Sequence, residues 1–234
     1  MTIFVSYLMM NIYTMENSVK NIGSLVVVRH GESEWNREGL WTGSRDIRLT
    51  PYGFETSKEL GLKISDIHLD HAFASMQVRS IETLASMLDA GHRYNISTEH
   101  VAALNERDYG DYTGKNKWEM EKMLGEEEFD KIRRDWDYPV PNGETLKIVY
   151  ERVVPFYIEK IFPLLRDDKN VLIVSHGNAI RALMKYIENV SDEKISAIEM
   201  IFGSILIYTL DTDGHMLNKE VRTVESSVRH EYLK

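Results

Sequence analysis

The chain has 234 residues, of which 43% are hydrophobic, and this is enough to bury a substantial core within one domain. Its formal net charge of -9 at pH 7 argues against general binding of nucleic acid or anionic membranes, because these polyanions select basic surfaces. The absence of cysteine excludes disulfides and thiolate metal sites and fits a reducing compartment. We therefore expect a cytoplasmic protein with no nucleic-acid or membrane partner, whose anion sites are local basic clusters.

Residues 1–23 are expected to form a poorly ordered N-terminal extension, followed by a single domain over 24–234. The first fourteen residues are apolar but contain no Lys or Arg and no clear cleavage site, so a secretory signal is the weaker interpretation. The other long apolar stretch, 197–210, contains Glu199 and Gly203 and is too short to span a bilayer.

Strand-like and helical segments alternate along the chain, which is typical of an α/β fold. The expected elements are a strand over 24–29, a helix over 49–64 with Thr50 as N-cap, a strand over 70–75, a helix over 76–91, an irregular stretch over 104–114, a charged helical region over 115–136, a turn-rich connection over 137–143, a helix over 144–165 interrupted near Pro155 and Pro163, a strand and helix over 170–187, a hairpin over 204–224 and a final tail.

A His-Gly pair follows each of two apolar runs that resemble buried strands. His30 and Gly31 come after "LVVV" and Arg29, and His176 and Gly177 come after "VLIV" and a serine. In open α/β sheets the ligand crevice lies beyond the carboxyl ends of the strands, so both histidines are expected to meet there. Either histidine alone is most simply a hydrogen-bonded residue at a strand end, but the pair together with Arg29 favours a functional site.

The residues around this pair indicate phosphoryl transfer. Positive charge from Arg29 lowers the pKa of the neighbouring His30, which keeps a ring nitrogen available for attack. Arginine also binds phosphoryl oxygens in bidentate fashion, so a neutral histidine beside it is a candidate for transient phosphorylation. Arg79 is the candidate second clamp and Glu106 the candidate proton donor and acceptor, although each alone would be interpreted as a surface charge.

Five segments in order resemble the 2,3-bisphosphoglycerate-dependent phosphoglycerate mutases of the histidine phosphatase superfamily. They are "RHGESEWN", "WTGSRD", "LNERDYGDYTGKNK", "IRRDW" and "SHGNAIRAL", and the resemblance runs from about Leu25 to Leu210. It implies a three-layer, phosphoglycerate mutase-like α/β fold with a mostly parallel sheet and helices on both faces. The implied reaction interconverts 3-phosphoglycerate and 2-phosphoglycerate in glycolysis and gluconeogenesis, with 2,3-bisphosphoglycerate as the priming donor and no metal.

The resemblance also implies roles for individual residues. His30 would be the phosphorylated nucleophile, and Glu106 would be the general acid and base. Arg29, Arg79 and His176 would hold the transferring phosphoryl group. The remaining ligand-contacting positions of the family fall on Ser33, Asn36, Thr42, Gly43, Arg107, Tyr109, Lys117, Arg133, Arg134, Gly177 and Asn178.

A second class of function stays open, because the same core in relatives hydrolyses phosphate esters. The alternative is a histidine phosphatase that acts on small phosphate monoesters or sugar bisphosphates. Lys117, Arg133 and Arg134 favour the mutase, since a bisphosphate carries a second anion that needs its own cations. The short connection "DWDYPVPNGETL" fits short-form mutases and also occurs among phosphatases, and "MIFGSILIY" departs from the usual mutase pattern. The oligomeric state is left open, with a homodimer as the candidate.

Overall fold

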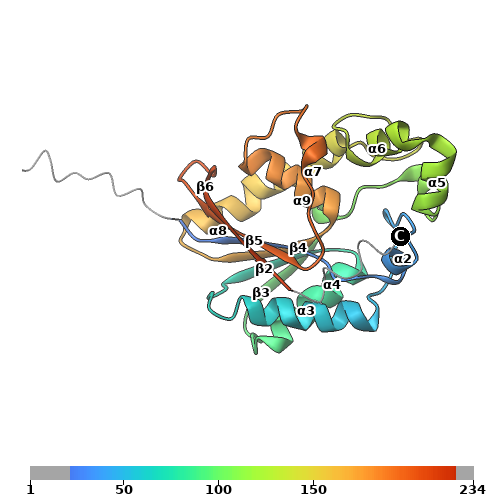
Figure 1. The fold of residues 1–234 in the computed structure, drawn as a ribbon. Coiled ribbons are helices and arrows are strands. Elements are labelled where there is room, and N and C mark those ends of the chain that lie inside the picture. The colour runs from blue at the N-terminus through green and yellow to red at the C-terminus, as the bar shows by residue number, and fades with distance from the viewer. Residues whose placement is uncertain (1–21, 225–234) are drawn as a thin grey trace, which may run out of the picture.

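The computed structural model describes residues 22–224 of the chain. The expectations for the N-terminal extension and for the final tail therefore fall, apart from 22 and 23, outside the described residues. The described part contains one six-stranded sheet in the order β3-β2-β4-β1-β5-β6 (Figure 1). Its strands are β1 (Leu25–Arg29), β2 (His71–Ser75), β3 (Ser97–Val101), β4 (Val171–Ser175), β5 (Ser204–Leu210) and β6 (Met216–Thr223).

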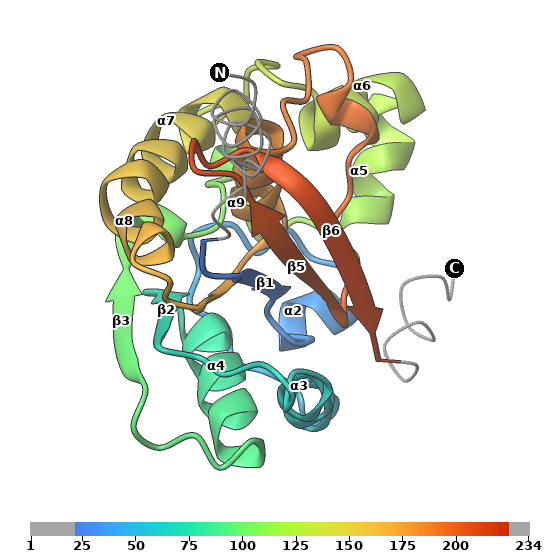
Figure 2. The same cartoon turned by 90° about the vertical axis from the view of Figure 1, so that its left-hand side faces the viewer.

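The sheet is mostly parallel, as the sequence predicts. β3, β2, β4 and β1 pair in parallel, and β5 and β6 continue the sheet in antiparallel fashion beyond β1. Figure 2 shows β3 and β6 at the two opposite edges. The parallel strands therefore end together at one end of the sheet, where ligands bind in folds of this kind.

Helices cover both faces of the sheet, which confirms the three-layer prediction (Figure 1). One face carries α3 (Pro51–Lys63) and α4 (Val78–Ala90), and the other carries α7 (Leu146–Phe156), α8 (Phe162–Arg166) and α9 (Gly177–Ile187). The α3 helix begins as expected, with the Thr50 hydroxyl accepting a hydrogen bond from the Gly53 N–H at 3.0 Å and Pro51 in the first turn. Among residues 22–224, no helix has both the length and the apolar character needed to cross a bilayer.

The central strands β1 and β4 are buried on both faces, which explains their continuous apolar sequences. Val26, Val28, Leu172 and Val174 pack into the core beneath α3 and α4. Their neighbours in sequence, including Leu25, Val27 and Ile173, pack into the core beneath α7 and α9. Alternation along each strand thus divides the side chains between two cores.

Two details differ from the sequence expectation, and a third agrees with it. The helical region over 115–136 is two helices, α5 (Lys117–Leu124) and α6 (Glu126–Arg134), because Gly125 adopts a φ of 84° between them. The β3 strand was not predicted, since its "STEHV" sequence lies exposed at the sheet edge and lacks an apolar run. The expected interruption of the long helix follows Pro155, where a π-helical turn, η3 (Tyr157–Ile161), joins α7 to α8.

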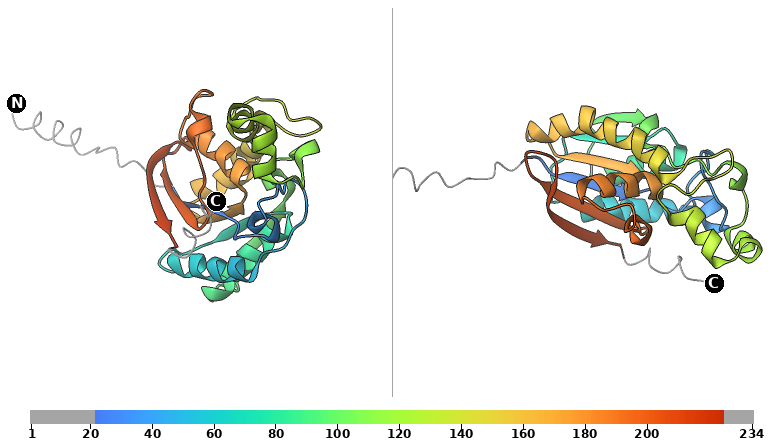
Figure 3. Two further views of the ribbon diagram at one scale, coloured as in Figure 1. Left: turned by 45° about the vertical axis from the view of Figure 1, so that its right-hand side comes forward. Right: turned by 90° about the horizontal axis from the view of Figure 1, so that it is seen from above.

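The remaining elements gather beyond the carboxyl ends of the parallel strands. In Figure 3, α5 and α6 lie at the same end of the molecule as α2 (Glu34–Arg37). Trp41 packs there against Met120, Phe129, Ile132 and Val140 in a small third core. Short helical turns complete the chain at η1 (Ala102–Leu104), η2 (Gly110–Tyr112) and η4 (Ile195–Ala197).

The two-sided burial of the central strands predicts a large difference between core and edge truncations. Ile173→Ala should lower the free energy of unfolding by about 2–5 kcal/mol, because the side chain is 1% exposed and its loss leaves a cavity. Val221→Ala on the edge strand β6 is the matched control, with a side chain 53% exposed and an expected change within about 0.5 kcal/mol. Urea unfolding measures both, and equal losses would contradict this account of the core.

Candidate active site

Three neighbouring strands end side by side and deliver the central side chains of the site. Arg29 at the end of β1 lies opposite Ser175 at the end of β4, and the His30 N–H donates to the Ser175 carbonyl at 2.9 Å. His176 follows Ser175 directly, and the neighbouring strand β2 ends at Ser75. The rings of His30 and His176 consequently lie 4.9 Å apart between centroids, with an interplanar angle of 56°.

The surroundings of His30 define which nitrogen can react. Its Nδ1 lies 2.7 Å from the Gly31 carbonyl, which can only accept, so Nδ1 carries the proton. Nε2 then holds a lone pair and accepts a hydrogen bond from Arg79 Nε at 3.3 Å. Burial, followed by the positive charges of Arg79 and Arg29, lowers the pKa of His30 well below its ordinary value of 6.5. His30 is therefore neutral near pH 7 and offers Nε2 as a nucleophile.

His176 is arranged as a hydrogen-bond donor beside this nucleophile. The Ser75 hydroxyl accepts from the Gln77 N–H at 3.2 Å and lies 2.7 Å from His176 Nε2, so its own proton can go to that nitrogen. With Ser75 as the donor to Nε2, the proton of the neutral ring is on Nδ1, and that atom is buried and has no partner among the described residues. Burial, then the charge of Arg79, lowers the pKa of His176 well below 6.5. A buried donor without a partner is costly, and an oxygen of a bound ligand would satisfy it.

Arg79 is fully buried next to both histidines. Its two terminal nitrogens donate to the carbonyls of Arg45 at 2.7 Å and Gly43 at 3.0 Å. Burial lowers the pKa of Arg79 to about 10, so it stays charged at neutral pH. Gly43 adopts a φ of 54°, and a Cβ there would lie only 2.9 Å from Thr113 Oγ1, so this tight turn of the chain suits glycine. The backbone around Gly43 thus holds a cation against the nucleophile.

Glu106 is fixed by hydrogen bonds to its backbone and to one of its carboxylate oxygens. Its N–H donates to Gln77 Oε1 at 2.8 Å, and its carbonyl accepts from Arg152 at 3.1 Å. Oε1 accepts from the Arg107 N–H at 2.7 Å and from two nitrogens of Asn178 at 3.2 Å. A Cβ at Gly177 would lie 3.7 Å from the guanidinium carbon of Arg29 and 3.8 Å from Glu106 Oε2. The glycine therefore keeps the space between these two charged groups open.

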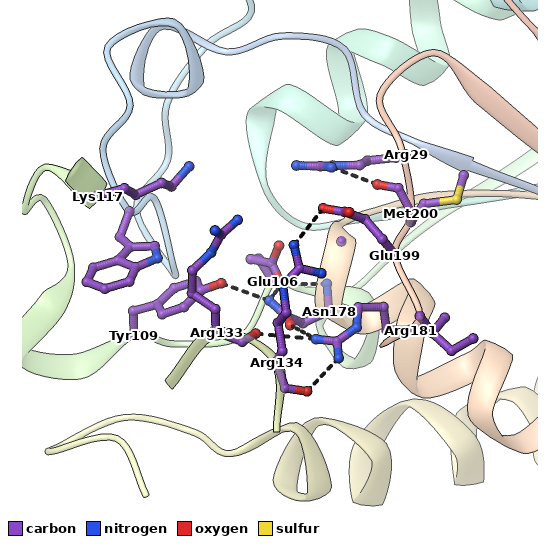
Figure 4. A pocket seen from close by; sticks show the side chains of 13 residues that line it. Arg29, Glu106, Tyr109, Lys117, Arg133, Arg134, Asn178, Arg181, Glu199 and Met200 are labelled. Carbon is purple, nitrogen blue, oxygen red and sulfur yellow. Dashed lines mark hydrogen bonds and ion pairs between the residues drawn. The ribbon is translucent and has the colours of Figure 1, made fainter. Parts of the chain in front are cut away.

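A cavity of about 90 Å³ opens beside these groups, and its walls are strongly charged (Figure 4). Arginine and lysine side chains from four parts of the chain contribute to it, against two glutamates. Figure 4 shows the charged ends of Lys117 and Arg133 turned toward Arg29. The lining residues are Arg29, Trp41, Glu106, Tyr109, Lys117, Arg133, Arg134, Gly177, Asn178, Arg181, Ile198, Glu199 and Met200. Such a cavity suits a small anion with more than one charged group.

The residues singled out from the sequence occupy three different places. Eight of them line the cavity, namely Arg29, Glu106, Tyr109, Lys117, Arg133, Arg134, Gly177 and Asn178. His30, His176 and Arg79 do not line it but form the buried cluster described above. The other five are outside the lining.

Four of these five residues have structural partners instead, and the fifth, Thr42, is buried. Ser33 caps α2, with its hydroxyl bonded to Asn36 Oδ1 at 2.8 Å, and Asn36 completes the capping box. Thr42 is buried, and its hydroxyl has no partner among the described residues. Gly43 supplies the carbonyl that holds Arg79, and Arg107 donates to the carbonyls of Ile132 and Arg133 at the end of α6. The structure thus does not bring these side chains into the cavity.

Several residues of the site were not singled out from the sequence. Ser75 orients His176, and Gln77 orients Glu106. The position of Ser75 at the end of a predicted strand could have indicated that it belongs to the site. Arg181 lies within the quoted "SHGNAIRAL" segment and donates to Asn178 Oδ1 at 3.0 Å. Phe202 stacks on Arg29, but its place in an apolar run gave no signal of this contact.

The fold and the histidine pair together define a class of phosphoryl-transfer enzyme. The family description that matches the chain, over residues 25–222, is the histidine phosphatase superfamily, branch 1. Solved structures agree on the fold. A mycobacterial glucosyl-3-phosphoglycerate phosphatase superposes with a TM-score of 0.74 at 19% identity, covering 86% of this chain and 98% of the other. Bacillus stearothermophilus YhfR superposes with a TM-score of 0.71 at 26% identity, covering 89% and 98%.

Curated relatives narrow the assignment. A 2,3-bisphosphoglycerate-dependent phosphoglycerate mutase of Parvibaculum lavamentivorans is 39% identical over 199 residues, or 84% of this chain and 95% of the relative. The protein of the same name from Cytophaga hutchinsonii is 42% identical over 184 residues, or 79% and 86%. The chain therefore belongs to the histidine phosphatase superfamily and, within it, to the family of 2,3-bisphosphoglycerate-dependent phosphoglycerate mutases.

The two neutral histidines predict an acid-sensitive fold. Below pH 6.5 the unfolded chain binds protons at both rings while the folded chain does not, so stability is lost as the pH falls from 6.5 toward the lowered pKa values. Each ring should contribute a slope of about 1.4 kcal/mol per pH unit in that range. Urea unfolding at about pH 7.5, 6.5 and 5.5 should show this, and His30→Gln should remove roughly one of the two contributions. An unchanged slope in His30→Gln would contradict the assignment.

Proposed function

We propose that this protein interconverts 3-phosphoglycerate and 2-phosphoglycerate through a phosphohistidine on His30 that 2,3-bisphosphoglycerate primes. The observation that carries the proposal is the neutral Nε2 of His30, held beside Arg79 and His176 and next to a cavity with further cations. Relatives with the mutase name at 39–42% identity support it. The setting that goes with this activity is glycolysis and gluconeogenesis in the cytoplasm.

The residues of the chain can be given roles in both halves of the reaction. His30 Nε2 attacks the phosphorus of the donor, and the bond from phosphorus to the ester oxygen breaks as Glu106 gives that oxygen a proton. Arg29 and Arg79 neutralise the charge on the transferring oxygens, and the Nδ1–H of His176 donates a hydrogen bond to one of them. In the second half, Glu106 takes the proton from the other hydroxyl, which attacks phosphorus and releases His30.

The second cationic cluster distinguishes a mutase from a simple monoester phosphatase. Neighbouring residues on a helix point about 100° apart, so Arg133 and Arg134 can share a cavity only near a helix end. They are the last two residues of α6, and both line the cavity with Lys117. Arg107 and Arg181 bind the last carbonyls of α6 and hold this end in place. Such a cluster fits the carboxylate or second phosphate of the proposed substrates.

No metal takes part in the proposed mechanism, because the guanidinium groups supply the positive charge at the reacting centre and the neutral His176 supplies a hydrogen bond. Among the described residues, no group of three or more His, Asp and Glu side chains comes together in a way that could hold an ion.

The proposed reaction predicts strong dependence on the priming bisphosphate. In an enolase-coupled assay, conversion of 3-phosphoglycerate should require 2,3-bisphosphoglycerate. Because enolase itself needs Mg²⁺, the chelator is tested without coupling, by phosphorus NMR of the two phosphoglycerates, and the rate should be unchanged. His30→Ala should abolish activity and should also abolish acid-labile phosphorylation of the protein. Loss of activity on chelation, or full activity of His30→Ala, would contradict the proposed mechanism.

The second cluster predicts a separation between two activities. Arg133→Ala should raise KM for phosphoglycerate by about ten- to hundred-fold, the loss expected for one charge-assisted hydrogen bond. Hydrolysis of p-nitrophenyl phosphate, which lacks a second anion, should change little. Lys122→Ala is the control, since Lys122 is an exposed cation on α5 outside the cavity lining. A parallel fall of both activities would favour the phosphatase alternative.

A further inference from the structure

The segment over 198–203, which joins η4 to β5, crosses the edge of the catalytic cavity. Ile198, Glu199 and Met200 line the cavity, and the Met200 carbonyl accepts a hydrogen bond from Arg29 Nη1 at 2.7 Å. Figure 4 shows this contact between Met200 and Arg29. Gly203, with a φ of 71°, turns the chain from this segment into β5. The segment is therefore tied to a residue that we expect to bind the transferring phosphoryl group.

Phe202 makes two ring contacts at the reacting centre. The guanidinium carbon of Arg29 lies 3.4 Å from the centroid of the Phe202 ring, which is a close stacking contact between a cation and an aromatic face. The same ring meets the His30 ring edge to face, with centroids 5.9 Å apart and an interplanar angle of 77°. One phenyl ring thus touches both the proposed nucleophile and a proposed clamp.

Phe202 is not an ordinary core residue. It belongs to none of the three apolar cores formed by the described residues, and it is only half-buried. Met200 in the same segment is buried in the core beneath α7 and α9, but Ile201, next to Phe202, is 43% exposed. Burial in the core therefore anchors the segment at Met200 and does not extend to the Phe202 ring. The position of the ring is instead matched to Arg29 and His30.

The ring can affect the chemistry in two ways. Stacking on one face of a planar guanidinium leaves its N–H groups directed in the plane, so Arg29 keeps a fixed orientation toward a phosphoryl group. An apolar ring beside His30 also occupies space from which water could reach a phosphorus atom on Nε2. Hydrolysis would need a water oxygen to attack that phosphorus, the P–Nε2 bond to break, and the water proton to pass to Glu106.

We infer that Phe202 is a positioning residue that holds Arg29 and shields phosphorylated His30 from water, so that it sets the ratio of mutase to hydrolytic activity. This inference rests on the proposed function and deepens it. It requires that removing the aromatic ring shorten the lifetime of the phosphoenzyme more than it lowers binding of phosphoglycerate.

The test uses three variants of the full chain. Wild type, Phe202→Leu, Phe202→Tyr and Ile201→Ala are labelled with radioactive phosphate from 2,3-bisphosphoglycerate, freed of donor, and followed as label is released to buffer. Phe202→Leu should release phosphate roughly ten-fold faster or more, because the smaller side chain leaves space for water beside phosphorylated His30. Phe202→Tyr, which keeps the ring, should restore a lifetime within about two-fold of wild type. Ile201→Ala, in the same segment, should match wild type.

Steady-state kinetics on the same proteins complete the test. Phe202→Leu should raise the ratio of hydrolysis to mutase turnover, with KM for phosphoglycerate nearly unchanged. An unchanged phosphoenzyme lifetime in Phe202→Leu, or an equal shortening in Ile201→Ala, would overturn the inference while leaving the proposed function intact. A wild-type protein that takes no label from 2,3-bisphosphoglycerate would overturn the proposed function, and this inference with it.

Discussion

The parallel pairing of β1 with β4 determines where the chemistry takes place. With Arg29 opposite Ser175, the next residue on each strand is a histidine, and the two rings meet beyond the sheet. A shift of one residue in the pairing of β1 with β4 would turn the side chains of the shifted strand to the opposite face of the sheet. Because both strands are apolar on both faces, alternation alone does not specify this register. Polar contacts where the two strands begin help to fix the register, since the Ser24 N–H donates to Asn170 Oδ1 at 2.8 Å.

A second constraint is that charged and polar groups are buried together at this point. An isolated buried guanidinium would be very unfavourable, but carbonyls of the 43–45 loop accept the hydrogen bonds of Arg79. These carbonyls hold the cation beside His30. Glu106 is oriented separately, by hydrogen bonds with Asn178 and Gln77. His176 Nδ1 is buried in this cluster without a partner among the described residues, and an oxygen of the transferring phosphoryl group is the partner we propose for it. The loops beyond the strands therefore hold the charged side chains in the fixed positions that the reaction needs.

Much of this arrangement could be read from the sequence, for identifiable reasons. The continuous apolar runs before His30 and His176 predicted buried strands, and the rule for carboxyl ends predicted that the histidines meet. The exposed strand β3 could not be predicted, because its sequence has neither an apolar run nor alternation. The contact of Phe202 with Arg29 joins residues far apart in the chain and depends on tertiary packing alone. Local patterns thus specified the elements, whereas the partners of each side chain in the site required the structure.

The central claim is that Nε2 of His30 is the atom that carries the phosphoryl group, because Nδ1 is held by the Gly31 carbonyl. The most direct measurement is nuclear magnetic resonance of protein labelled with nitrogen-15 in histidine and primed with 2,3-bisphosphoglycerate. Coupling between phosphorus and Nε2 of one histidine, lost in His30→Ala, is the result that the account predicts. Coupling to Nδ1, or phosphorylation of His176 in place of His30, would contradict it.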